Sequence, residues 1–275
     1  MCETGGNRPM MKPFTLFAIL LFLNLSLQSL PKQRILMSKS TELIVVTTAD
    51  WNSSQATLRR YSRANIRMPW REVGEPITVV VGKSGLAWGK GAISVDAQVA
   101  KPDDPVKKEG DGRAPAGVFY LTRIFGYTAQ PLPGWKMPYQ YLNSSVECVD
   151  DAKSKFYNRI VDRSAVAPDW QSSEHMLRQD DLYRWGVLVD HNPAPEPGAG
   201  SCIFMHIWRG PGQPTVGCTA MPQADLESLI AWLDPQRTPV LVQLPMGEYK
   251  KLREGWRWPK IIDAPENESR SLGTH

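Results

Sequence analysis

Short apolar runs alternate with turn-forming clusters along most of the chain. The β-branched segment 41–48 precedes turn-like residues at 50–54 and an alternating segment at 58–63, which together predict a hairpin. Further strands are predicted at 77–81, 117–124, 187–189, 202–208 and 239–244, several of them next to glycine- and proline-rich turns. Short strands separated by turns favour a mainly β fold, a sandwich or barrel, over alternating βα units.

Helical spacing is clear in one segment, from Pro222 to Asp234, where a proline stands in the first turn. Its apolar residues recur at positions i, i+3, i+4 and i+7, namely Leu226, Leu229, Ile230 and Leu233. Residues 172–185 are predicted to be helical in part. Region 127–169 has no clean period, and we interpret it as an insertion or lid over the sandwich. The polar segment 248–275 predicts a C-terminal surface tail.

The N-terminal segment, residues 1–30, resembles a signal or anchor. Lys12 precedes an apolar run over residues 14–27, and the polar sequence PKQR follows at 31–34. The run is short for a membrane span. Because residues 26–29 offer no A-x-A cleavage pattern, an uncleaved anchor is one alternative, and a buried core helix is another. The pattern favours export.

Composition and charge describe an ordinary globular protein. The 275 residues are 42% hydrophobic and 22% charged, which excludes wholesale disorder, collagen and a polytopic membrane protein. The formal net charge of +4 is too small for the dense basic stripe of a nucleic-acid-binding protein. We therefore expect no nucleic-acid partner.

Three cysteines follow the N-terminal segment: Cys148, Cys202 and Cys218. An odd number in an exported protein leaves at least one thiol unpaired, and such a thiol is a candidate reactive group. Cys148 and Cys202 are either a disulfide or two buried thiols.

The densest chemistry lies between Gly200 and Pro222. His206 stands near the end of a predicted strand, just before a glycine- and proline-rich loop, where reactive groups are commonly presented. The loop returns to Cys218 through Gly217, whose backbone can approach a ligand closely. A thiol needs a nearby base to act as a nucleophile at neutral pH, and an imidazole is the natural partner. The order His, loop, Cys is therefore compatible with a Cys–His pair.

Structural and metal-binding alternatives compete with this pair. Buried cysteines are common in β-rich cores, and a lone histidine is more often a hydrogen-bonded structural group. Cys218, His206 and His191 are a possible zinc set, but no paired Cys-x-x-Cys motif supports it. Cys202 and His206 would lie about 13 Å apart along one strand, whereas zinc ligands lie about 2 Å from the ion. We expect no metal.

The segment from His206 to Cys218 resembles a known signature. His206, the loop and the sequence TVGC at 215–218 are similar to the His…Ser/Thr-x-Gly-Cys motif of the L,D-transpeptidase catalytic domain, also called the YkuD domain. The sequence DGRAPAGVF at 111–119 resembles the same family's Pro-x-Gly-x-Phe turn and strand. With VLVDHN at 187–192 and the helix after Cys218, the resemblance extends over residues 41–244.

The resemblance implies an L,D-transpeptidase-like β-sandwich at residues 41–247 whose cleft holds the cysteine. Carried over by position, it implies Cys218 as the nucleophile and His206 as the base. The backbone N–H groups of Gly217 and Cys218 would form the oxyanion hole, and Thr215 fits the family's Ser/Thr position. No cofactor is implied.

Two positions depart from the family pattern. Val216 stands where a histidine usually precedes the glycine, and Ala220 stands where an Arg or Asn often follows the cysteine. Both departures remove a polar contact to the thiolate or the substrate. His191 and Asn192 are candidate substitutes at the end of a predicted strand, although a turn-forming role is an equal alternative. Arg209 is a third candidate contact.

The predicted function is therefore that of an exported peptidoglycan L,D-transpeptidase of the periplasm or cell wall. Cys218 would form a thioester with a stem-peptide donor and pass the acyl group to an amine. The loss of polarity at Ala220 predicts an atypical donor, with L-alanine at position one of the stem. A carbapenem is expected to form a covalent adduct at Cys218. The alternatives are an L,D-carboxypeptidase or cysteine peptidase, and a non-catalytic peptidoglycan-binding module.

Overall fold

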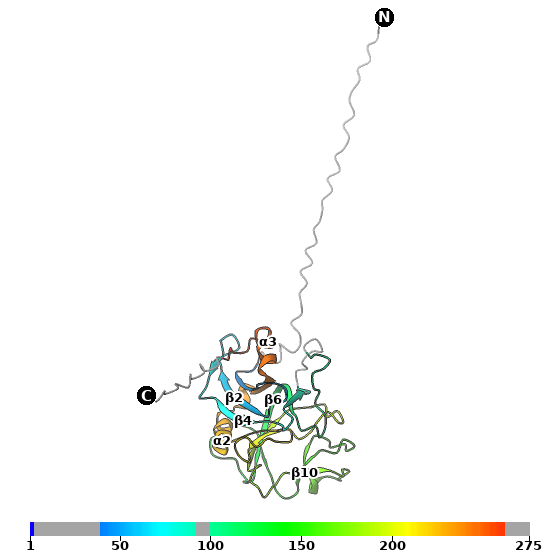
Figure 1. Cartoon of the computed structure of the whole chain (residues 1–275), viewed down its shortest axis with the longest axis vertical. Coiled ribbons are helices and arrows are strands. Elements are labelled where there is room, and N and C mark those ends of the chain that lie inside the picture. Colours follow the sequence, from blue (N-terminus) through cyan, green and yellow to red (C-terminus); the bar gives the residue numbers. More distant parts are fainter. Residues whose placement is uncertain (3–38, 92–99, 262–275) are drawn as a thin grey trace, which may run out of the picture.

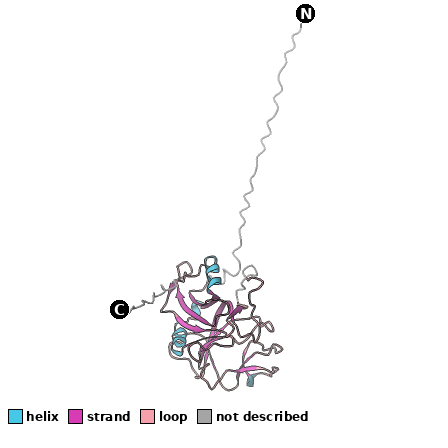
Figure 2. Cartoon of the chain, in the orientation of Figure 1, coloured by secondary structure: helices cyan, strands magenta, loops and turns pink. Residues whose placement is uncertain are grey.

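The computed structural model describes residues 1–2, 39–91 and 100–261, and strands dominate it (Figures 1 and 2). The strands are β1 (Glu42–Thr48), β2 (Gln55–Ser62), β3 (Arg71–Glu72), β4 (Ile77–Val80), β5 (Leu86–Trp88), β6 (Ala114–Gly126), β7 (Tyr139–Tyr141), β8 (Val146–Val149), β9 (Ile160–Asp162), β10 (Ser173–His175), β11 (Trp185–Val189), β12 (Phe204–Ile207), β13 (Thr219–Met221) and β14 (Val240–Pro245). The helices are α2 (Gln223–Trp232) and α3 (Met246–Trp256), with 3-10 turns η1 (Arg163–Ala165) and η2 (Pro235–Arg237). The predicted mainly β fold is confirmed.

The predicted signal or anchor, residues 1–30, lies outside the described residues except for its first two positions. Across the ranges that the structure describes, no helix has the length and apolar character needed to cross a membrane.

The main sheet closes on itself. Its strands follow the order β1-β14-β6-β11-β12-β13-β4-β2-β3, and β1 also pairs with β2, so the path returns to its start. The predicted β1–β2 hairpin is confirmed, with Thr48 opposite Ala56. Asp50 stabilises the connecting turn, because its carboxylate accepts hydrogen bonds from the backbone N–H groups of Asn52 and Ser53. The sandwich that the sequence predicts is thus one continuous, closed sheet.

The core lies inside this sheet and beneath the two helices. Every residue of β1 is buried, since β1 has a strand on each side and contacts α3. Helix α2 confirms the helix predicted at 222–234, and its Leu226, Leu229 and Ile230 are buried where it contacts β11 and β12. Burial of each such side chain contributes about 1.5–3 kcal/mol.

Helix α3 corrects the prediction of a surface tail for residues 248–261, and the remainder of that predicted tail, 262–275, lies outside the described residues. Its Tyr249 is fully buried, and Trp258 stacks on that ring with the ring centroids 5.6 Å apart. Ile261 is also buried. The surrounding Lys and Glu residues make the segment polar on average, but Tyr249, Leu252 and Trp256 follow the i, i+3, i+7 spacing of a helix.

A second sheet, of order β10-β8-β9, is built from the region predicted as an insertion or lid, with β10 just beyond it. It lies at the end of the molecule opposite α3 (Figure 1). A disulfide between Cys148 on β8 and Cys202 ties this sheet to the segment before β12. The disulfide decides between the two alternatives that the sequence left open.

Residues 172–185 are not helical, which corrects the sequence prediction. After the short strand β10, Arg178 binds the Asp180 carboxylate through two nitrogens, at 2.8 and 2.6 Å. Asp181 has a φ of 55°, a left-handed conformation that interrupts a helix. Local side-chain hydrogen bonds thus compete successfully with helix formation.

Candidate active site

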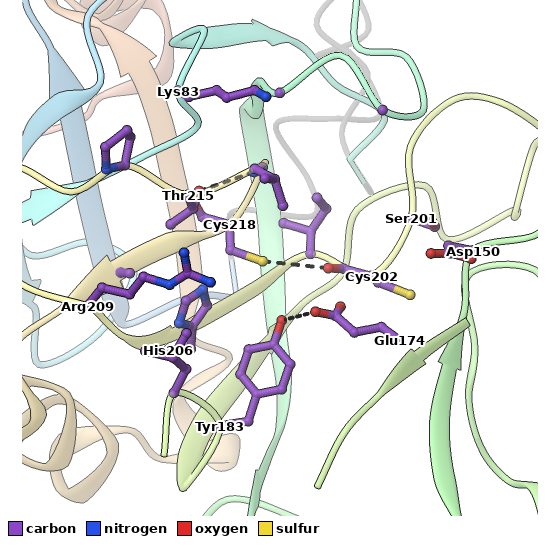
Figure 3. A pocket seen from close by; sticks show the side chains of 18 of the residues that line it. Lys83, Asp150, Glu174, Tyr183, Ser201, Cys202, His206, Arg209, Thr215 and Cys218 are labelled. Carbon is purple, nitrogen blue, oxygen red and sulfur yellow. Dashed lines mark hydrogen bonds between the residues drawn. The ribbon is translucent and has the colours of Figure 1, made fainter. Parts of the chain in front are cut away.

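The parallel strands β12 and β13 bring the predicted base and nucleophile together. His206 on β12 lies opposite Ala220 on β13, and Cys218 directly precedes β13. Both side chains line one pocket, as Figure 3 shows. Across the sheet, His206 pairs with Gly186 on β11, where a side chain would collide with the ring of Phe125. The aromatic packing beside His206 therefore requires glycine at this position.

The imidazole of His206 is held by its own strand end. Its Nδ1 lies 2.8 Å from the Ile207 carbonyl oxygen, so Nδ1 carries the proton and Nε2 is the acceptor. Burial lowers the pKa of His206 to about 4, while this hydrogen bond opposes the shift. The imidazole is therefore neutral at pH 7 and can accept a proton.

The thiol of Cys218 is buried in a smaller apolar cluster, separate from the main core, that also contains Phe204, Tyr183 and the disulfide-bonded Cys148 and Cys202. Its Sγ accepts a hydrogen bond from the Phe204 N–H at 3.3 Å and lies 3.6 Å from the Cys202 carbonyl oxygen (Figure 3). Burial raises the pKa of Cys218 to about 12, and the nearby Glu174 carboxylate adds to the rise. In the absence of substrate the cysteine is a neutral thiol.

Thr215 shapes the turn that leads to the cysteine. Its hydroxyl donates to the Cys218 carbonyl at 2.6 Å and accepts from the Gly217 N–H at 3.1 Å. Its backbone is fixed in turn, because its N–H donates to Val81 and its carbonyl accepts from the Lys83 N–H. Since the Gly217 N–H is engaged, the Cys218 N–H is the better candidate for an oxyanion donor.

The pocket has a volume of about 550 Å³. The β12–β13 region contributes His206, Trp208, Arg209, Cys218 and Ala220, together with the turn 213–217. The opposite wall comes from residues at or near the second sheet: Asp150, Ser173, Glu174, Arg178, Leu182 and Tyr183. In the ranges that the structure describes, no three His, Cys, Asp or Glu side chains are grouped to hold a metal ion.

Three residues of the opposite wall were missed by the sequence analysis: Glu174, Arg178 and Tyr183. The Tyr183 hydroxyl donates to Glu174 at 2.6 Å (Figure 3). The Tyr183 ring packs edge-on against His206, with ring centroids 5.1 Å apart. Burial raises the pKa of Glu174. No local motif marks these residues, because the pairing of β10 with β8 and the Cys148–Cys202 disulfide place them.

His191 and Asn192 do not belong to this pocket. Among the described residues that line it, neither is present, and both side chains are buried elsewhere. His191 Nε2 lies 3.0 Å from the Ala199 carbonyl oxygen. The Asn192 amide donates to the carbonyls of Glu196 and Gly200. Both side chains hold the following loop, in agreement with the turn-forming alternative, whereas the candidate contact Arg209 does line the pocket.

The fold and pocket define a mainly β protein in which a buried thiol and a neutral imidazole share one substrate-sized cavity. Residues 47–242 match the family model of the L,D-transpeptidase catalytic domain, YkuD, and the chain belongs to this family. No curated protein is significantly similar to the chain. No solved structure is significantly similar to it either.

Proposed function

We propose that this protein is a peptidoglycan L,D-transpeptidase in which Cys218 is the nucleophile and His206 the general base. The observation that carries the proposal is the placement of both side chains, from adjacent parallel strands, in one pocket within the family domain. The substrate is a stem peptide whose scissile bond joins an L-centre to a D-residue. Family membership also supports export to the periplasm or cell wall.

The reaction starts from a neutral pair. Because the pKa of Cys218 is about 12 and that of His206 about 4, the thiol keeps its proton until substrate arrives. His206 Nε2 takes that proton as Sγ attacks the peptide carbonyl carbon. The Cys218 N–H stabilises the oxyanion. The C–N bond then breaks, His206 gives the proton to the leaving D-residue amine, and a thioester remains.

An amine of a second stem peptide resolves the thioester. Its nitrogen attacks the carbonyl carbon, the C–S bond breaks, and the proton lost by the amine passes through His206 to the departing sulfur. Water in place of the amine would give the carboxypeptidase reaction. Thr215 has a supporting role, since it fixes the Cys218 carbonyl and the Gly217 N–H.

Incubation of the protein with purified muropeptides, followed by intact-mass and product analysis, tests this proposal. We expect an acyl adduct on Cys218 and cross-linked products, both abolished in Cys218→Ala. Thr219→Ser is a matched control, because it keeps the buried hydroxyl that donates to Gln243. Binding of muropeptides without an adduct would indicate a non-catalytic binding module, and hydrolysis alone would indicate the carboxypeptidase.

A carbapenem serves as a second probe of the nucleophile. Its strained ring carbonyl imitates the acyl donor, so we expect a covalent adduct that peptide mapping assigns to Cys218. Absence of this adduct in a preparation that cross-links muropeptides would show that the exposed Val216 and the buried Ala220 alter the pocket's recognition of the drug.

The choice of donor follows from Ala220, which lines the pocket and offers no polar contact. One charge-assisted hydrogen bond contributes about 1.5–3 kcal/mol, which corresponds to a tenfold or larger preference between competing carbonyls. This supports L-alanine at position one as the donor, the atypical alternative to diaminopimelate at position three. Arg209 is the competing contact. Fragment mass spectrometry of digested wall should reveal L-alanine-to-diaminopimelate bonds, and exclusive diaminopimelate-to-diaminopimelate bonds would contradict the assignment.

A further inference from the structure

We infer that Glu174 is the subsite for the positively charged amine of the acyl acceptor, and that it favours aminolysis of the thioester over hydrolysis. The inference rests on the proposed function and adds the residue that binds the acceptor amine. Glu174 lines the pocket that contains Cys218 and His206, and its side chain is 28% exposed, so a ligand can reach it.

The position of Glu174 relative to the base is fixed through Tyr183. The Tyr183 hydroxyl donates to Glu174 Oε1 at 2.6 Å, and the same ring packs against the His206 imidazole with 5.1 Å between centroids. Tyr183 is itself buried, which leaves its ring little freedom to move. One aromatic ring therefore separates the carboxylate from the proton acceptor (Figure 3).

The neighbouring cation leaves Glu174 with most of its negative charge. Arg178 Nη1 lies 3.7 Å from Glu174 Oε1, but the guanidinium makes its short hydrogen bonds, at 2.8 and 2.6 Å, with Asp180. Glu174, Asp180 and Arg178 together carry a net charge of −1. Asp150 adds a second carboxylate to this wall of the pocket, whereas Lys83, Lys107 and Arg209 line other parts of it. The contacts of Tyr183 and Arg178 both involve Oε1, so among the described residues Oε2 is the oxygen available to a ligand.

A negative charge at this position selects an acceptor by its chemistry. A primary amine arrives as an ammonium at neutral pH, because the pKa of such a group is about 10. Glu174 attracts that cation into the pocket, whereas water gains nothing from the charge. The bound ammonium first loses one proton to solvent, which leaves a neutral amine. As the amine nitrogen attacks the thioester carbonyl carbon and the C–N bond forms, the neutral imidazole of His206 accepts the second proton that the nitrogen loses. The C–S bond then breaks, and His206 gives this proton to the departing sulfur of Cys218.

The test measures how a preformed acyl-enzyme partitions between an amine acceptor and water. Glu174→Gln keeps an oxygen that accepts from Tyr183 and removes the charge. Starting from the same preformed acyl-enzyme, we expect the ratio of aminolysis by a muropeptide amine to hydrolysis to fall at least tenfold. The matched control is Asp181→Asn, since Asp181 carries the same charge nearby, lies outside the pocket and has a φ of 55° that asparagine tolerates.

A second measurement uses the unaltered protein and does not depend on how a variant folds. Added salt should raise the KM for the ammonium acceptor and leave that for neutral hydroxylamine unchanged, because screening acts only on the charged acceptor. Equal loss of aminolysis and hydrolysis in Glu174→Gln, or equal salt dependence of both acceptors, would overturn the inference. If the unaltered protein forms no acyl-enzyme at all, the proposed function itself fails, and the inference fails with it.

Discussion

His206 and His191 lie in two regions of the molecule. The two histidines have similar burial, hydrogen bonding and pKa, but they have different chemical groups around them. Each histidine is buried, each places one ring nitrogen near a backbone carbonyl, and burial lowers each pKa to about 4. The difference lies in the neighbours. His206 shares a pocket with Cys218, whereas His191 Nδ1 is enclosed with no hydrogen-bond partner among the described residues. A perturbed pKa therefore identifies a buried histidine, and only its neighbours identify a catalytic candidate.

Replacement of each histidine by alanine gives the sharpest contrast between the two regions. Both His206→Ala and His191→Ala leave one backbone carbonyl without its partner, so each should cost about 1–3 kcal/mol of unfolding free energy. His206→Ala should in addition lower cross-linking activity per folded molecule by about 10²–10⁴-fold, the usual contribution of a general base. Muropeptide product analysis with denaturant unfolding measures both. Substantial activity in folded His206→Ala would refute the assignment of the base.

The reactivity of the Cys218 thiol, which lines the same pocket as His206, should depend steeply on pH. Because burial raises the pKa of Cys218 to about 12, its thiolate fraction grows about tenfold per pH unit, and alkylation by iodoacetamide should accelerate about 10³-fold from pH 6 to pH 9. Peptide mapping is needed to separate Cys218 from the exposed Cys2. A rate that is already constant above pH 6 would instead indicate a thiolate–imidazolium pair and would make the two histidines electrostatically different.

Sequence patterns predicted those features of the fold and of the candidate site that depend on residues close together in the sequence. The β1–β2 hairpin and α2 follow from periodicity, and the glycine-containing turn before Cys218 indicated the proposed nucleophile. Periodicity could not separate the two histidines, because each stands at the end of an apolar strand. Periodicity also could not predict the opposite wall of the pocket. Glu174 and Tyr183 are placed there by long-range strand pairing and a disulfide, which leave no periodic signal in the sequence.

The region around His206 contains a disulfide, whereas the loop after His191 is held by hydrogen bonds. Cys202 lies just before the strand that carries His206 and is bonded to Cys148, 54 residues away in sequence, whereas the hydrogen bonds of Asn192 hold the loop after His191. The joint variant Cys148→Ser, Cys202→Ser should lose about 4 kcal/mol of unfolding free energy through loop-closure entropy. Treatment of the unaltered chain with a reductant should give the same loss in denaturant unfolding. A loss below about 1 kcal/mol would mean that strand pairing alone holds the second sheet.

The last prediction concerns a property in which the two histidines should behave alike. Both have a pKa of about 4 in the folded state and about 6.5 in the unfolded chain. Between these values the unfolded state binds more protons, so the stability that each neutral histidine contributes is present above pH 6.5 and is lost as the pH falls towards 4. For each histidine the loss between pH 7 and pH 4.5 is roughly 2–3 kcal/mol.

Denaturant unfolding at pH 7 and pH 4.5 measures this loss. The carboxylates also titrate over this range, but they are the same in the unaltered protein and in each histidine variant, so their contribution cancels when the two proteins are compared. His206→Gln and His191→Gln should each reduce the pH dependence of the unfolding free energy by a similar amount, although only the first should impair catalysis. A much smaller reduction for His206 would mean that solvent in the pocket hydrates its protonated form. In that case the pKa of His206 would lie above that of His191, and His206 would be a stronger base than its burial in the pocket indicates.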